Sequence, residues 1–211
     1  MHKYFIKTPW IVKKIFPSYI WSLPASDDVV YLTFDDGPHP IITPWVLNQL
    51  KMHKVKATFF CIGNNVEKFP EVFQQILHEG HSVGNHTYCH LNGWNTDDKK
   101  YLDDVSKASQ LFKTNLFRPP YGRIKNSQAK KIPAAMQTRG AKIIMWDVLS
   151  ADFDTSFTPE HCLNNVLENV RRGSIIVFHD SEKANENLRY TLPKTLESLK
   201  QTGFCSRNIE L

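Results

Sequence analysis

Residues 29–38 read VVYLTFDDGP. The first six are mainly β-branched or aromatic and predict a buried strand, and the Asp-Asp-Gly-Pro that follows predicts a loop at its carboxyl end. Two adjacent carboxylates, Asp35 and Asp36, repel each other unless their roles are separated. A cation bound to one carboxylate separates them, because the other then stays free to accept a proton. We therefore expect a divalent-metal site here; the alternative is a simple turn.

Strand and helix patterns alternate along the rest of the chain. Short apolar runs predict strands at residues 57–62, 81–85, 116–118, 142–147, 174–178 and 204–211. Amphipathic segments bounded by capping residues, proline or glycine predict helices at 43–54, 70–79, 97–113, 127–139, 158–172 and 192–202. Residues 185–187 are expected to form a polar loop. Apolar strands between helices are typical of a parallel sheet covered by helices.

Polar residues at the predicted strand ends favour a barrel over an open sheet. Six of them fall at or just after the carboxyl ends of different strands: Asp35, Asp36, His86, Arg118, Asp152 and His179. In a β/α barrel these ends meet at one face, where active sites are built, whereas an open sheet would spread them along a line. No repeat or linker interrupts the chain, so we predict a single domain.

His86 and His90 are four residues apart, which on a helical turn would place both imidazoles on one face. Taken alone, this spacing is equally typical of surface histidines. Two imidazoles and one carboxylate would leave a coordination position open for water, the arrangement of a hydrolase. Cys89 lies between the histidines, and we expect it to pack rather than to bind the metal.

Five segments in order resemble the motifs of the polysaccharide deacetylase family, the NodB-homology domain of carbohydrate esterase family four. They are TFDDGP (33–38), HTYCH (86–90), RPPYG (118–122), the stretch from Trp146-Asp147 to Asp152-Phe153, and IVFHD (176–180). The resemblance covers residues 28–211 and implies an α/β fold, a distorted (β/α)7 barrel with the active site at the carboxyl ends of the strands. We expect residues 28–211 to form the catalytic domain and residues 1–27 an N-terminal arm.

The resemblance implies a division of roles at the site. Asp36, His86 and His90 would bind a divalent metal, usually zinc, with cobalt or nickel accepted by related enzymes. Asp35 would be the general base and His179 the general acid for the departing amine.

Three further residues would support these groups. Arg118 would orient Asp35, and Asp152 would hold Arg118 and tune His179. The backbone N–H of Tyr121 would help to stabilise the oxyanion.

The substrate-binding residues implied by the resemblance are Tyr121, Trp146, Phe153 and Val177. Phe153 stands where the family usually has tryptophan, and Val177 where it usually has leucine, so a groove wall is kept and the acetyl pocket is slightly wider. Tyr88 and Trp94 are further aromatic candidates for stacking on sugars, and Trp94 is expected to be exposed.

The activity implied is removal of N-acetyl groups from N-acetylglucosamine units of peptidoglycan, chitooligosaccharides or a glycoconjugate. An O-acetyl esterase of the xylan type or a cyclic amidase would use the same residues. A non-catalytic glycan-binding relative is less expected, because such proteins typically lose a ligand or the base, and both are present here.

Composition limits the partners and the location. A net charge of +5 without a dense basic tract does not favour nucleic acid, and four scattered cysteines favour free thiols. Lysines interrupt every apolar run of the first twenty residues, which argues against a signal peptide and favours a cytoplasmic or inner-membrane location, with the cell envelope left open. The arm is expected to pack on the domain through its apolar residues, with peripheral membrane contact as the alternative: Trp10, Ile11, Ile15, Phe16 and Trp21. Oligomeric state is left open.

Overall fold

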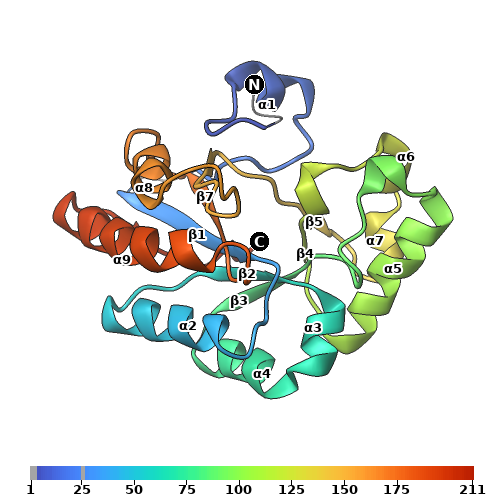
Figure 1. Cartoon of the computed structure of the whole chain (residues 1–211). Coiled ribbons are helices and arrows are strands. Elements are labelled where there is room, and N and C mark those ends of the chain that lie inside the picture. The colour runs from blue at the N-terminus through green and yellow to red at the C-terminus, as the bar shows by residue number, and fades with distance from the viewer. Residues whose placement is uncertain (1–3, 25–26) are drawn as a thin grey trace.

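A computed structural model describes residues 4–24 and 27–211 (Figure 1). Its centre is a parallel sheet with strand order β5-β4-β3-β2-β1-β7-β6, and β8 pairs with the start of β1. The strands are β1 (Val29–Asp35), β2 (Thr58–Cys61), β3 (Ser82–Asn85), β4 (Leu116–Phe117), β5 (Lys142–Ile143), β6 (Val148–Leu149), β7 (Ile175–His179) and β8 (Cys205–Ser206). The sheet curls into the distorted (β/α)7 barrel that the motifs imply, with β2 in the middle of the strand order and β1 between β2 and β7.

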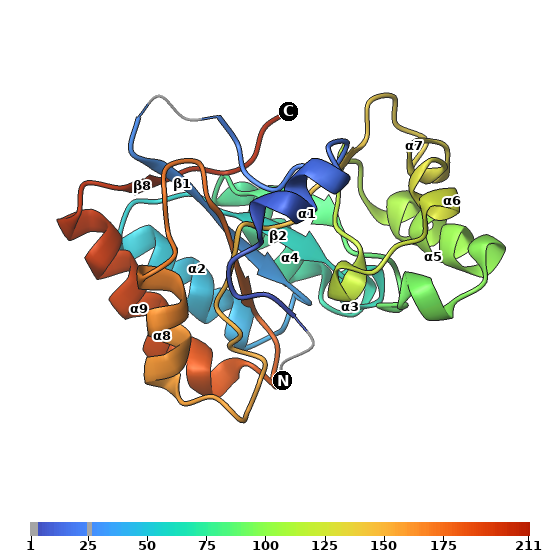
Figure 2. The ribbon, with the colours of Figure 1, turned by 90° about the horizontal axis from the view of Figure 1, so that it is seen from above.

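The two outer strands, β5 and β6, do not pair with each other, and the N-terminal arm lies across the gap. Ile20 bridges Ile144 beyond β5, while Lys7 bridges Val148 in β6. The backbone N–H of Met145 donates to the Ile20 carbonyl at 2.7 Å, so the arm shares in the backbone hydrogen bonding at this edge of the sheet. Figure 2 shows α1 and its flanking segments crossing this side of the sheet.

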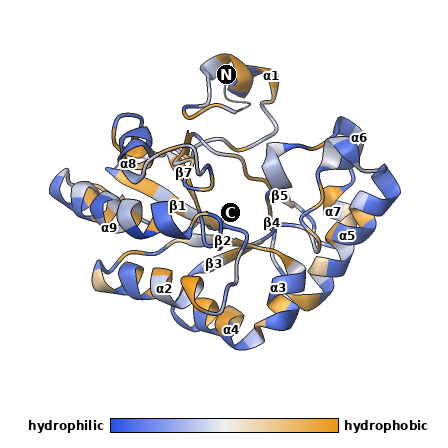
Figure 3. Cartoon of the chain, in the orientation of Figure 1, coloured by the Kyte–Doolittle hydropathy of each residue, from blue (hydrophilic) through white to orange (hydrophobic). Residues whose placement is uncertain are grey.

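Helices surround the sheet, with α1 on the side of the gap and the others on the remaining sides (Figure 1). They are α1 (Trp10–Ile15), α2 (Ile42–Met52), α3 (Gly63–Lys68), α4 (Pro70–His78), α5 (Asp98–Leu111), α6 (Asn126–Ala129), α7 (Ile132–Ala135), α8 (Pro159–Leu167) and α9 (Asn185–Gln201), with short 3₁₀ turns η1 (Gly93–Asn95) and η2 (Pro120–Gly122). The larger helices turn apolar residues toward the sheet and polar residues outward, whereas α1 has no buried residue (Figure 3). No helix among the described residues combines the length and apolar character needed to cross a membrane.

The main core lies between the central strands and the helices that cover them. Phe34 of β1 stacks between Phe59 of β2 and Phe178 of β7, with ring centroids 5.0 and 5.9 Å apart. All three rings are at most 1% exposed. Burial of this aromatic surface stabilises the pairing of β1 with β2 and β7, and this pairing fixes the positions of the last residues of β1 and β7.

Several element boundaries differ from the sequence predictions. α1, α3 and β6 were not predicted, because each is shorter than the stretch of sequence over which a hydrophobic pattern can be recognised. The helix predicted at 127–139 is two single turns, with Pro133 near the start of the second. The polar loop predicted at 185–187 is wrong: these residues form the first turn of α9, and Asn187 is buried.

The arm packs differently from the prediction. Trp21 is 9% exposed, as expected, but Trp10, Ile11 and Ile15 are more than half exposed and Phe16 is 38% exposed. Hydrogen bonds and ion pairs, more than these side chains, hold the arm in place. Residues 1–3 and 25–26 of the predicted arm lie outside the described residues, and membrane contact stays a prediction.

Candidate active site

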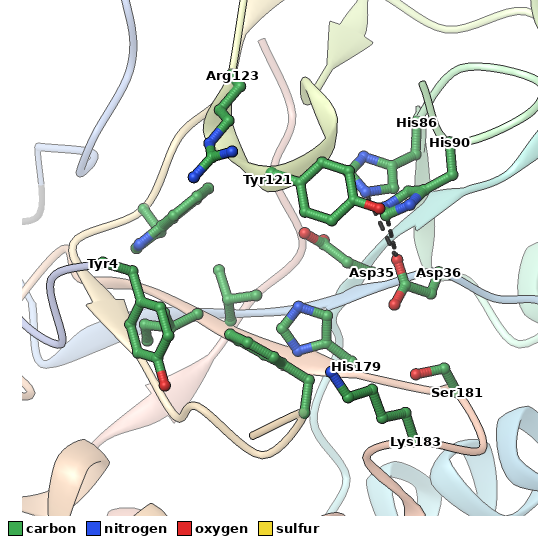
Figure 4. A pocket seen from close by; sticks show the side chains of 14 residues that line it. Tyr4, Asp35, Asp36, His86, His90, Tyr121, Arg123, His179, Ser181 and Lys183 are labelled. Atoms are coloured by element: carbon green, nitrogen blue, oxygen red, sulfur yellow. Dashed lines mark ion pairs between the residues drawn. The ribbon is translucent and has the colours of Figure 1, made fainter. Parts of the chain in front are cut away.

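Four of the six polar residues predicted at the strand ends line one cavity of about 340 Å³ (Figure 4). Asp35 ends β1, His179 ends β7, and the two are register partners across the strand pair. The cavity is lined by Tyr4, Asp35, Asp36, His86, His90, Tyr121, Arg123, Trp146, Leu149, Phe153, Val177, His179, Ser181 and Lys183. Arg118 and Asp152 are wholly buried behind this lining.

Asp36, His86 and His90 bring three ligand atoms within 4.8 Å of one another. The Oδ1 atom of Asp36 lies 3.2 Å from Nε2 of His90 and 3.7 Å from Nε2 of His86. This oxygen is buried, and no described residue gives it a hydrogen bond of acceptable geometry. A buried acceptor without a donor, between two imidazole nitrogens, fits a bound cation.

The surroundings of the histidines also suit metal binding. Nδ1 of His86 lies 2.8 Å from the Arg118 carbonyl oxygen, to which it can donate a hydrogen bond. The lone pair of Nε2 is then free to bind a metal. Burial is the main cause that lowers the pKa of His86 to about 4, so the imidazole is neutral, as a ligand must be. Burial opposes ionisation of Asp36, but its contact with His90 and the field of His179 hold its pKa well below the ordinary value.

The HTYCH segment is not the helical turn that the spacing predicted. Thr87 and His90 have φ values of 64° and 57°, so the chain loops through left-handed backbone between the two ligands. Asp104 of α5 fixes this loop by accepting from the backbone N–H groups of Tyr88 and Cys89 at 2.8 and 2.9 Å. Cys89 is exposed rather than packed, because the loop turns its side chain outward.

Asp35 is held by a fully buried arginine. Nη1 of Arg118 donates to Oδ1 of Asp35 at 2.6 Å and to Oγ1 of Thr33 at 2.8 Å. Nε and Nη2 of Arg118 donate to the carbonyls of Ile144 and Met145, and its guanidinium stacks on Phe60. Burial lowers the pKa of Arg118, yet its fixed partners keep the pair an ion pair.

His179 is held by Asp152 on the other side of the cavity. Oδ1 of Asp152 lies 2.7 Å from Nδ1 of His179, and Oδ2 accepts the His179 backbone N–H at 2.8 Å. Burial opposes protonation, but the charge and hydrogen bond of Asp152 outweigh it and raise the pKa of His179 to about 9. The predicted contact of Asp152 with Arg118 is not among the hydrogen bonds of the described residues, because both carboxylate oxygens turn toward His179.

Aromatic rings form the walls of the cavity. The ring centroids of Tyr121 and His90 are 4.6 Å apart, and those of Phe153 and His179 are 4.9 Å apart. Trp146 packs on Gly122, where a Cβ atom would come within 2.6 Å of its ring. The expectation for Trp94 is confirmed at 58% exposure, but neither Trp94 nor the buried Tyr88 lines the cavity.

Comparison with known proteins supplies the family. The polysaccharide deacetylase family profile matches residues 22–140. A peptidoglycan-N-acetylglucosamine deacetylase of Bacillus cereus is 34% identical over 190 residues, which cover 87% of this chain and 87% of that protein. The chain belongs to the polysaccharide deacetylase family. It is thus an enzyme of carbohydrate esterase family four.

Two further matches cover most of the chain. A chitooligosaccharide deacetylase of Azorhizobium caulinodans is 32% identical over 182 residues, 81% of this chain and 84% of that protein. The crystal structure of the Bc1960 peptidoglycan N-acetylglucosamine deacetylase in complex with 4-naphthalen-1-yl-N-oxidanyl-benzamide superposes with a TM-score of 0.84 at 33% identity. It covers 96% of this chain and 95% of that one.

The sequence did not predict a role at the site for Tyr4 or Asp180. Tyr4 reaches the cavity from the arm and packs on Phe153 at 5.3 Å, which no local pattern indicates. Asp180 closes the fifth motif, and its carboxylate accepts from Gly37 N–H at 3.0 Å and from the Thr43 hydroxyl, which fixes the loop after Asp36. A Cβ at Gly37 would collide with Asp180, so the motif glycine is explained by this close approach.

Proposed function

We propose that this chain is a metal-dependent N-deacetylase acting on N-acetylglucosamine units of a glycan. One observation carries the proposal: the Asp36, His86 and His90 ligand atoms share one cavity with the buried carboxylate of Asp35 and with His179. Asp35 is paired with Arg118, and His179 is paired with Asp152. The names of the relatives, which act on peptidoglycan N-acetylglucosamine and on chitooligosaccharides, support the reaction. Zinc suits the nitrogen and oxygen donors best.

A divalent ion held by these three residues would supply the Lewis acidity that lowers the pKa of a water ligand and polarises the acetamide carbonyl. Asp35 accepts the proton of the attacking water, and the hydrogen bond from Arg118 holds this carboxylate in place at the cavity. The Tyr121 N–H donates to the oxygen on which negative charge develops.

His179 completes the reaction by protonating the amine nitrogen as the carbon–nitrogen bond breaks. Its pKa, raised to about 9 by Asp152 against the effect of burial, keeps it protonated near neutral pH. The products are acetate and the free amino sugar. Val177, buried in the cavity wall, would contact the acetyl methyl group, while Tyr121, Trp146 and Phe153 flank the sugar.

An acetate-release panel tests this function. The zinc-loaded protein would be given chitotetraose, peptidoglycan fragments and acetylxylan, and the released acetate quantified. We expect release from the two N-acetylated substrates and little from acetylxylan. Release from acetylxylan alone would instead assign an O-acetyl esterase, and release from none would favour a glycan-binding relative.

A further inference from the structure

The N-terminal arm carries a cluster of exposed apolar side chains that the proposed reaction does not use. Twelve large apolar or aromatic side chains are exposed in the described part of the chain, and five of them fall within residues 5–16: Phe5, Trp10, Ile11, Ile15 and Phe16. The other seven are scattered from Ile41 to Leu211. Single exposed apolar residues are normal, whereas a contiguous group marks a surface that binds a partner.

The short helix α1 turns much of this cluster outward. At about 100° per residue, one outer arc of about 140° holds four side chains, all of them exposed: Trp10, Ile11, Lys14 and Ile15. On the inner side, Val12 packs against the core cluster that contains Trp21, and Lys13 pairs with Asp147. In Figure 3 α1 stands out from the body of the fold. The helix is thus fixed by its inner side and presents its outer side to solvent.

Two stretches of the chain contain no acidic residue. Residues 1–26 hold four lysines, and residues 105–146 hold six lysines and three arginines, with neither Asp nor Glu in either stretch. These thirteen positive charges compare with +5 for the whole chain, so the remaining residues carry a net charge of −8. The positive charge is therefore concentrated on these two stretches.

The two stretches lie side by side in the fold. The arm bridges the residue that follows β5, and Tyr19 of the arm lines a depression together with Lys130 and Lys142. Lys14, Lys130 and Lys142 are exposed, and none of them forms an ion pair with a described residue. The Lys14 ammonium lies 4.8 Å from the Trp10 ring centroid, so a free cation and an exposed indole stand together. The apolar cluster thus has free positive charges within it and beside it.

We infer that this arm face binds the surface of a membrane that contains anionic lipids. The arm face consists of Trp10, Ile11, Lys14 and Ile15 of α1 with Lys130 and Lys142 beside them. Apolar and aromatic side chains gain by entering the boundary between headgroups and acyl chains, where tryptophan is favoured. Lysines beside them pair with the phosphates of anionic headgroups. This inference is independent of the proposed deacetylase activity.

Two other occupants match the arm face less well. A nucleic acid would pair with the lysines but would gain nothing from the two exposed isoleucines, since it is read through phosphates and base edges. A second copy of this chain, docked through the same face, would bring like charges together. An anionic bilayer surface alone uses both the charges and the apolar side chains.

Co-sedimentation of the full chain with lipid vesicles tests the inference. Vesicles of phosphatidylcholine alone are compared with vesicles that contain about one-third phosphatidylglycerol, at low and high salt. We expect binding to the anionic vesicles to be at least about 10-fold tighter at low salt and to weaken as salt rises.

Two double variants separate the apolar part from the charged part. Trp10→Gln with Ile15→Gln should weaken binding to anionic vesicles roughly 10-fold, because the side chains that enter the headgroup region are lost. Lys130→Gln with Lys142→Gln should weaken it about 5- to 30-fold and flatten the salt dependence. All four side chains are exposed, so the melting temperature should stay that of the wild type.

Matched controls remove equally exposed residues elsewhere. Ile41→Gln with Met52→Gln removes two apolar side chains at α2, each 66% exposed, and Figure 1 places α2 far from α1. Lys51→Gln with Lys200→Gln removes two exposed lysines from α2 and α9. Neither control should change vesicle binding by more than about 2-fold, apart from the small effect of net charge.

The inference is overturned if the chain binds neither kind of vesicle, if it binds both equally, or if the controls weaken binding as much as the arm-face variants. Tight binding of a single-stranded DNA oligonucleotide, with vesicle binding that ignores Trp10→Gln and Ile15→Gln, would assign a general polyanion site instead. A dimer in light scattering that these two substitutions dissociate would assign the face to contacts between copies. Acetate release from soluble chitotetraose reports on the proposed function separately and should be unchanged in all four double variants.

Discussion

Asp35 and Asp36 are neighbours in the chain but have unlike surroundings. Asp35 continues the strand and pairs with a buried arginine, whereas Asp36 has a φ of 83° and turns toward the histidines. Left-handed backbone of this kind costs about 1–3 kcal/mol at a non-glycine residue and is kept where the surrounding structure demands it. Five of the seven such residues in the described chain lie around the cavity: Asp36, Thr87, His90, Tyr121 and Ala151.

Replacement of the proposed acid tests its role directly. His179→Ala should lower kcat about 10²- to 10⁴-fold, because the departing amine would have to leave without a positioned proton donor. Zinc binding should persist, since the three ligands are untouched. An unchanged rate of acetate release in the zinc-loaded variant would remove His179 from the mechanism.

The pH profile tests the Asp152–His179 pair. The pKa of His179 is raised to about 9, so its proton, and the stability gained from the pair, are present at lower pH and lost as pH rises through that value. Burial lowers the pKa of His179, and the Asp152 carboxylate outweighs this effect. Asp152→Asn removes that carboxylate, and the charges of Asp36 and Asp35 raise the pKa of His179 less. We expect the alkaline limb of kcat/KM to move down by at least about one pH unit. A limb that stays in place would contradict the assignment.

At the scale of elements, the N-terminal arm is built into the barrel. Lys7 and Lys13 both form ion pairs with Asp147, which lies between β5 and β6 and also accepts from Ser174. Burial opposes ionisation of Asp147, but its three partners lower its pKa. The arm thus closes the gap in the sheet and brings Tyr4 to the cavity.

Asp147→Asn should loosen the arm. We expect a loss of about 1–3 kcal/mol in the free energy of unfolding, because two ammonium groups lose their shared carboxylate. Asp103→Asn, which removes an exposed ion pair with Lys99 on α5, should cost less than about 0.5 kcal/mol. Denaturant titration and limited proteolysis of the arm measure both, and equal effects of the two changes would argue against an anchoring role.

At the scale of the whole molecule, the barrel and the residues that meet at its cavity could be predicted because strand ends of one parallel sheet converge. The alternation of apolar runs with helices and the polar residues after each strand are local patterns. The loop shape of HTYCH could not be predicted, because Asp104 of a later helix imposes it. Tyr4 and Arg123 were missed for the same reason: only tertiary contacts bring them to the cavity.

We expect the stability at acid pH to depend on His81, a buried histidine outside the cavity lining. His81 accepts the Ala57 backbone N–H at 3.2 Å, and burial is the main cause that lowers its pKa to about 4. The unfolded chain therefore binds a proton at His81 at a higher pH than the folded protein does. The free energy of unfolding falls as pH drops from about 6.5 toward 4. His81→Asn, which can keep the acceptor, should reduce the loss between pH 8 and pH 5 by about 1–2 kcal/mol. Unfolding curves that keep the wild-type pH dependence would contradict this origin.

Metal-dependent acetate release from an N-acetylglucosamine oligosaccharide tests the central claim most directly. Chelator-treated protein should release no acetate from chitotetraose, and one equivalent of zinc should restore release in the wild type and in the exposed-histidine control His78→Ala. Asp36→Ala should stay inactive at that zinc level, because one of the three ligands is gone. Release that continues unchanged after chelation, or that zinc restores equally in Asp36→Ala, would contradict the account.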